Sequence, residues 1–205
     1  MPRRTVSLAV KFRQVTAQLE GTRSQMEMLL RKKDITIDDI NHVYVGLFIE
    51  VCTHFEALIE DLFVGLVAGD LYSNGIPVKR NIIIKPASNA RVAIFQGKQY
   101  LDWLPFEDRT LPRAKIYFNQ GLPFSDLAKP QLNMLDRYFI IRNAIAHKSR
   151  VAKDRFQTQI QDMPLLPQEK TPAGYLRSIP NSSTGLTQYE LCVLEFVGMA
   201  DTICK

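Results

Sequence analysis

The feature that most constrains the fold is a long apolar seam between residues 37 and 68. Large apolar side chains recur there at steps of three and four residues, which is the spacing of one face of an α-helix. The seam consists of Tyr44, Leu47, Val51, Phe55, Leu58, Leu62 and Leu66. A helix with such a face has to bury it against other elements, and the neighbouring patterns indicate that these are helices too.

Four further helices are predicted around the seam. Three of them run from about Thr5 to Arg31, from Arg109 to Asn119 and from Pro130 to Arg150. The last one begins near Thr187, because Thr187 and Glu190 have the spacing of a capping box ahead of an apolar face. The sequence therefore predicts an all-α fold.

Two stretches depart from the helical period. Residues 78–100 contain β-branched runs on either side of Pro86, so a short β-hairpin insertion is expected there. Residues 157–186 contain four prolines and several turn-forming residues, which predict a long proline-rich irregular loop before the last helix.

Length and composition fit one domain over residues 1–205. The chain is 205 residues long and 46% hydrophobic, which is enough for a sizeable core. Cys52, Cys192 and Cys204 are far apart, as in a protein that keeps its thiols reduced. No apolar stretch is long enough for a membrane span, so we expect a cytoplasmic protein without membrane partners.

The segment Arg142-Asn143-Ala144-Ile145-Ala146-His147 places polar groups inside the otherwise apolar helix predicted over 130–150. Burying a guanidinium, an amide and an imidazole is costly unless each has a partner or a function. An arginine can stabilise developing phosphoryl charge, and a histidine can transfer a proton near neutral pH. These are the groups that cleave a phosphodiester without a metal.

The segment resembles the R-x4-6-H signature of the HEPN superfamily, here with a spacer of four residues and an asparagine directly after the arginine. The helix of the apolar seam also resembles the helix that pairs with the signature helix in bacterial HEPN ribonucleases and toxins. Its matching residues are Tyr44, Glu50, Phe55, Glu56, Leu58, Ile59, Asp61, Leu62 and Phe63.

The resemblance implies a HEPN-like up-and-down helical bundle that acts as a homodimer on RNA. It also implies a role as a toxin, with an antitoxin protein as partner, or in defence against phage. Five positions apart on an ideal helix, Arg142 and His147 point roughly 140° apart. The two side chains therefore converge only if the helix end unwinds or a second subunit contributes its own copy.

The expected activity is a metal-independent endoribonuclease. His147 is predicted to move the proton of the 2′-hydroxyl or of the leaving oxygen, and Arg142 to stabilise the phosphorane. Asn143 would orient the phosphate or the imidazole. Glu56 would position Arg142, with Glu60 as a competitor for that role.

Charge is consistent with an anionic partner. The net charge is +5, and Lys148, Ser149 and Arg150 follow the signature directly, so we expect them to contact RNA phosphates. No zinc, P-loop or nucleophile-elbow motif is present, and neither a metal nor another cofactor is predicted.

Two alternatives stay open. Arg142 can instead form a core ion pair with an acid of the seam helix while His147 closes a helix end, which is a purely structural role. A HEPN-like domain can also be non-catalytic and use the same basic surface to bind RNA or a nucleotide, or to assemble with another protein.

Overall fold

The computed structural model describes residues 2–205 of the chain, and it is built predominantly from α-helices. Its long helices are α1 (Val6–Lys32), α2 (Ile37–Ala68), α5 (Lys129–Ala146) and α8 (Gln188–Ile203). Shorter helices are α3 (Ala87–Phe95), α4 (Phe106–Tyr117), α6 (Arg150–Ile160) and α7 (Pro172–Arg177). The predicted all-α class is confirmed.

The chain forms two compact units that are interleaved along the sequence. Unit 1 consists of residues 2–13, 54–136 and 197–205, and unit 2 consists of residues 14–53 and 137–196. Each of the four long helices therefore contributes residues to both units. The expectation of one domain stays a prediction.

Unit 1 is centred on the aromatic ring of Phe63. Its ring centroid lies between 5.1 and 5.5 Å from those of Trp103, Tyr117, Phe118 and Phe124. These rings come from the C-terminal part of α2, from α4 and from the segments that flank α4. Such tilted and edge-on contacts are the arrangements that aromatic rings prefer, so this cluster is the core of the unit.

Unit 2 packs the N-terminal part of α2 against residues of α5 and α8. The rings of Tyr44 and Tyr189 meet edge to face with 5.6 Å between centroids, and the ring centroid of Tyr138 lies 4.9 Å from that of Phe196. At the start of α8, the Thr187 hydroxyl accepts from the Glu190 amide, and the Glu190 carboxylate accepts from the Thr187 amide. The predicted capping box is thus present.

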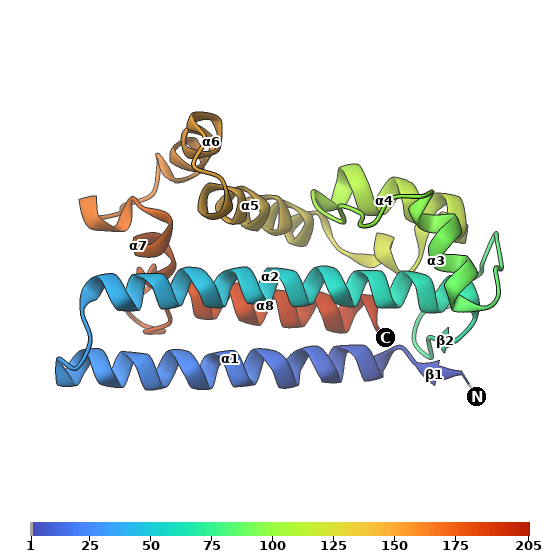
Figure 1. Ribbon diagram of the computed structural model, residues 1–205, viewed down its shortest axis with the longest axis horizontal. Helices are drawn as coiled ribbons and strands as arrows, with labels where there is room; N and C mark the ends of the chain where they lie inside the picture. The colour runs from blue at the N-terminus through green and yellow to red at the C-terminus, as the bar shows by residue number, and fades with distance from the viewer. Residues whose placement is uncertain (1) are drawn as a thin grey trace. The chain divides into compact units, whose positions relative to one another are not determined.

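The strands do not lie where the hairpin was predicted. β1 (Arg3–Arg4) and β2 (Leu71–Tyr72) lie side by side as a parallel pair within unit 1 (Figure 1). Within residues 78–100 the structure instead contains α3, whose buried residues Ala90, Ile94 and Phe95 follow helical spacing. Helical burial overrides the β-branched composition of this stretch.

Residues 157–186 are less irregular than expected. α6 continues to Ile160, a short 3₁₀ helix covers Pro167–Glu169, and α7 follows. The Thr171 hydroxyl accepts from the Gly174 amide at the start of α7, and Pro172 occupies an early helical position, which suits its fixed φ angle. Only the stretches between these elements are irregular.

Candidate functional site at the junction of α5 and α6

The signature segment lies at a sharp turn between two helices (Figure 1). The helix predicted to run to Arg150 ends at Ala146, and a new helix, α6, starts at Arg150. The break occurs because the Ser149 hydroxyl accepts from the Ala152 amide at 3.3 Å and so caps α6. His147 is therefore placed directly after the end of α5.

His147 lies at this helix end without being buried. Its amide donates to the Asn143 carbonyl at 2.9 Å, which continues the helical hydrogen-bond pattern by one residue. Its side chain is exposed, whereas Arg142 and Asn143 are half-buried. The expectation that all three polar groups are buried is corrected for His147, because the apolar helix has ended before it.

A cleft of about 190 Å³ lies beside the imidazole within unit 2. Its walls come from the last turns of α5, from the junction and from the first turns of α6. The lining residues are Phe139, Ile140, Asn143, His147, Ser149, Val151, Ala152 and Arg155. The cleft thus combines an apolar wall with an imidazole, an amide and a guanidinium.

Arg142 reaches this cleft only indirectly. Its Nη1 donates to the Asn143 side-chain oxygen at 3.2 Å, and Asn143 lines the cleft whereas Arg142 does not. Within unit 2, Arg142 forms no ion pair with a described residue. Asn143 therefore bonds to both residues: its side-chain oxygen accepts from Arg142, and its backbone carbonyl accepts from the His147 amide.

The predicted phosphate-contacting residues differ in their positions. Ser149 lines the cleft and also caps α6, so it has a structural role as well. Lys148 and Arg150 are exposed and lie outside the cleft lining. Arg150 is 93% exposed and only loosely paired with Asp154, at 3.6 Å, so its charge is available to solvent.

Glu56, the predicted partner of Arg142, is half-buried on α2 and belongs to unit 1. Arg142 belongs to unit 2, and the pairing stays a prediction. Glu60, the competing acid, is engaged within unit 1: it accepts from the Trp103 indole at 3.3 Å and pairs with Arg91 at 2.5 Å.

Arg155 is a charged residue of the cleft that was not predicted as part of the site. The sequence shows it as one of several basic residues after the signature, in a stretch expected to be helix end and loop. In the structure, Val151 and Arg155 are one turn apart on α6 and share the face that lines the cleft. A helix predicted over residues 150–160 would have placed Arg155 on the same face as Val151.

The described residues contain neither a metal-binding group nor a membrane-spanning helix. Within residues 2–205, no three His, Cys, Asp or Glu side chains come together as a metal-binding group. Among the same residues, no helix combines the length and the apolar character that are needed to cross a bilayer. The three cysteines are buried free thiols, as their spacing predicted.

Comparisons with known proteins give no independent guide to the site. The chain was compared with protein-family models, with curated proteins and with solved structures, and no match was found in any of the three.

Proposed function

We propose that the protein is a metal-independent endoribonuclease of HEPN type whose site is centred on His147 and Arg142. The observation that supports this proposal best is the exposed imidazole of His147 beside a cleft that also contains Asn143 and Arg155. A general base must reach the proton that it removes, and this position makes the imidazole accessible to a bound polyanion.

The proposed reaction uses the substrate's own hydroxyl as the nucleophile. One imidazole takes the proton of the 2′-hydroxyl, and the resulting oxyanion attacks the adjacent phosphorus. The bond to the 5′-oxygen breaks, and that oxygen receives a proton from a general acid. The products are a 2′,3′-cyclic phosphate and a 5′-hydroxyl, and DNA is inert because it lacks the nucleophile.

Developing charge on the phosphorane needs fixed cations. Arg142 and Arg155 are the candidates, because a guanidinium stays charged and can donate two parallel hydrogen bonds to phosphate oxygens. Arg142 donates a hydrogen bond to the side chain of Asn143, and Asn143 lines the cleft. Lys148 and Arg150 would contact neighbouring backbone phosphates, independently of base sequence.

A homodimer would supply the second imidazole. One copy has a single histidine at this cleft, whereas the reaction uses a base and an acid. Val151 is 63% exposed at the rim, and the apolar wall includes the half-buried Phe139 and Ile140. A two-fold contact over this surface would cover apolar side chains and place two signature segments at one groove.

A non-catalytic binding module is the second candidate function. It is favoured by the position of Arg142, which does not line the cleft with His147. Such a module would hold RNA or a nucleotide, or a partner protein, with the same basic residues. It would need neither a second imidazole nor a direct Arg142–His147 contact.

Incubation of the purified protein with total RNA in EDTA tests the proposal. We expect cleavage that leaves cyclic phosphate ends and falls by roughly 100-fold or more in His147→Ala, the usual contribution of a general acid–base group. His42→Ala is the matched control, because His42 is exposed and bonds only the Asp38 carbonyl of its own helix, at 2.7 Å. RNA binding without cleavage would refute the nuclease and favour the binding module.

Expression in cells gives a second readout. An active toxin should be poorly tolerated as the wild type and well tolerated as His147→Ala, and co-expression of an antitoxin would relieve the difference. Equal tolerance of both forms would argue against a toxin.

A further inference from the structure

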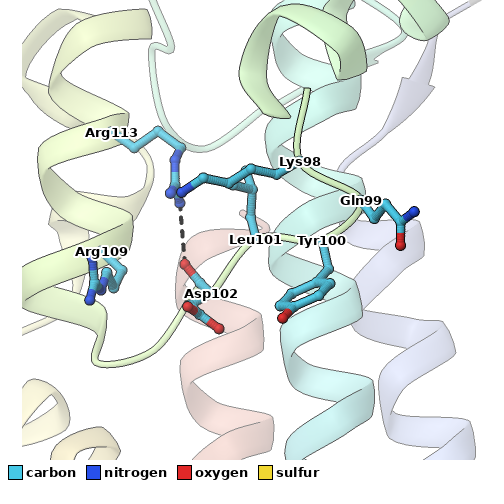
Figure 2. Close-up of a pocket in the computed structure, with 7 residues that line it drawn as sticks. All are labelled: Lys98, Gln99, Tyr100, Leu101, Asp102, Arg109 and Arg113. Carbon is cyan, nitrogen blue, oxygen red and sulfur yellow. Dashed lines mark hydrogen bonds between the residues drawn. The ribbon is translucent and has the colours of Figure 1, made fainter. Parts of the chain in front are cut away.

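A second cationic hollow lies in unit 1 and contains none of the residues of the cleft at the α5–α6 junction. Its volume is about 400 Å³, which is within the usual range of small-molecule sites. It is formed between the segment 98–102, which follows α3, and one face of α4 (Figure 2). Its lining residues are Lys98, Gln99, Tyr100, Leu101, Asp102, Arg109 and Arg113.

Arg113 is the most constrained cation of this pocket. Its guanidinium carbon lies 4.8 Å above the ring of Trp103, and Nη1 donates to the Asp102 carbonyl at 3.4 Å. Burial lowers the pKa of Arg113, and the nearby positive charge of Arg109 lowers it further. A half-buried cation next to a second cation is stabilised when an anion binds.

The charge of Asp102 offsets the pocket cations only in part. Within residues 2–205, no ion pair involves Lys98, Arg109 or Arg113. Asp102 is the only acid in the lining, and Arg113 bonds to its backbone carbonyl. Figure 2 shows Lys98 and Arg113 extending toward each other from the two walls of the pocket.

The floor beneath Arg113 is rigid. Trp103 is 1% exposed, its indole nitrogen donates to Glu60 Oε2 at 3.3 Å, and its ring packs on Phe63. The Thr110 hydroxyl donates to the Trp103 carbonyl and so ties α4 to the segment before it. Arg113 is therefore held in place before a ligand arrives, which reduces the entropy lost on binding.

We propose that this pocket binds a small phosphorylated ligand, with its phosphate groups between Lys98, Arg109 and Arg113. Two guanidinium groups and an ammonium suit a group with several negative charges and oxygen atoms arranged for paired hydrogen bonds. Tyr100 is 75% exposed at the rim and offers a ring for the remainder of the ligand. A volume of about 400 Å³ fits a small molecule.

Trp103 provides a direct test, because it is the single tryptophan of the chain and lies under Arg113. Titration with inorganic pyrophosphate should change its fluorescence along a saturable curve. Arg109→Gln should weaken this binding roughly tenfold or more, since hydrogen bonds between charged partners are among the strongest. Arg109 is exposed, so the variant should keep its fold.

Lys115→Gln is the matched control. Lys115 is an exposed cation of the same helix that does not line the pocket, and its loss should leave pyrophosphate binding unchanged. Arg113→Gln should weaken binding at least as much as Arg109→Gln, and calorimetry would measure it independently of the tryptophan signal.

Three results would overturn the proposal: no saturable response to millimolar pyrophosphate, equal binding by Arg109→Gln and Lys115→Gln, or tighter binding of a single-stranded RNA oligonucleotide at this pocket. His147→Ala should bind pyrophosphate as the wild type does. The failure of this proposal is thus distinguishable from the failure of the proposed nuclease.

Discussion

Arg23 in unit 2 and Arg113 in unit 1 are both half-buried, yet their surroundings are opposite. Arg23 is 13% exposed and donates to Glu20 and to Glu190, with Nη2 to oxygen distances of 2.5 and 2.8 Å, and to the Tyr44 hydroxyl at 3.1 Å. Arg113 has an indole ring and a backbone carbonyl instead. The pKa of Arg23 is raised, chiefly by the hydrogen bond to Glu20, whereas burial lowers that of Arg113.

This difference separates a structural charge from a binding charge. The carboxylates around Arg23 compensate its desolvation, so the group joins α1, α2 and α8 within unit 2. Arg113 forms no ion pair with a described residue, and Asp102 compensates its charge only in part, which leaves interaction energy available to a ligand. Replacing Arg23 should therefore lower stability, whereas replacing Arg113 should weaken ligand binding and leave stability nearly unchanged.

The largest effect on stability is expected for Arg23→Met. The substitution leaves Glu20, Glu190 and the Tyr44 hydroxyl without their shared donor, and should lower the free energy of unfolding by about 2 kcal/mol. Urea unfolding followed by circular dichroism measures the change. Lys129→Met is the control: its pair with Glu107 is exposed, so the loss should stay below about 0.5 kcal/mol. Equal losses of unfolding free energy for Arg23→Met and Lys129→Met would contradict the structural role of Arg23.

Two buried tyrosines of unit 2 allow the same comparison between a polar group with partners and one without. The Tyr44 hydroxyl accepts from Arg23 and donates to Glu27 at 2.9 Å, and burial raises the pKa of Tyr44 to about 12. The Tyr189 hydroxyl is buried without a hydrogen-bond partner among the described residues. Tyr44→Phe should cost about 1 kcal/mol, and Tyr189→Phe should be neutral or slightly stabilising. A larger loss for Tyr189→Phe in urea unfolding would contradict this.

Asp136 is a carboxylate that only the charge of Lys129 partly compensates. Its Oδ1 is buried without a partner among residues 2–205, and burial raises its pKa, with Glu107 and Asp108 adding to the shift. Because the folded state holds the proton more tightly, the wild type loses stability as pH rises above about 4. Asp136→Asn should therefore stabilise unit 1 at pH 7 by under about 1 kcal/mol.

Thermal unfolding at pH 7 and pH 4 checks this prediction. The advantage of Asp136→Asn should narrow at the lower pH, where the wild-type carboxyl takes up its proton. An advantage that is independent of pH would show that the effect does not come from the charge.

The smallest change in stability is expected for Arg113→Met. Loss of the cation–π contact costs about 0.5 kcal/mol, and removal of an uncompensated charge offsets it, so urea unfolding should be nearly unchanged. Pyrophosphate should raise the melting temperature of the wild type and not that of this variant. A loss close to that of Arg23→Met would make Arg113 a structural residue.

The long helices could be predicted because their apolar spacing is sustained. α2 has the predicted bounds, and the capping box marked the start of α8. The end of α5 was misplaced because the residues after Ala146 are compatible with a helix, and the competing Ser149 cap is a local hydrogen bond. Because the end of α5 was misplaced, α6 was not predicted, and neither was its face that brings Arg155 to the cleft.

The pocket around Arg113 could not be predicted from the sequence. Arg109 and Arg113 are one turn apart, which indicates a shared face of a helix, but that spacing is common on solvated helices. Lys98 and Asp102 line the same pocket next to Trp103, which bonds to Glu60, a residue far away in the chain. Long-range contacts of this kind leave no periodic pattern.

The interleaving of the two units has a consequence for biosynthesis. Both units contain residues of α8, and the Thr5 hydroxyl donates to the carbonyl of Lys205 at 3.3 Å. The core of unit 2 includes Tyr189 and Phe196 of α8, so it cannot close until the ribosome has released that helix, and the apolar N-terminal part of α2 stays uncovered until then.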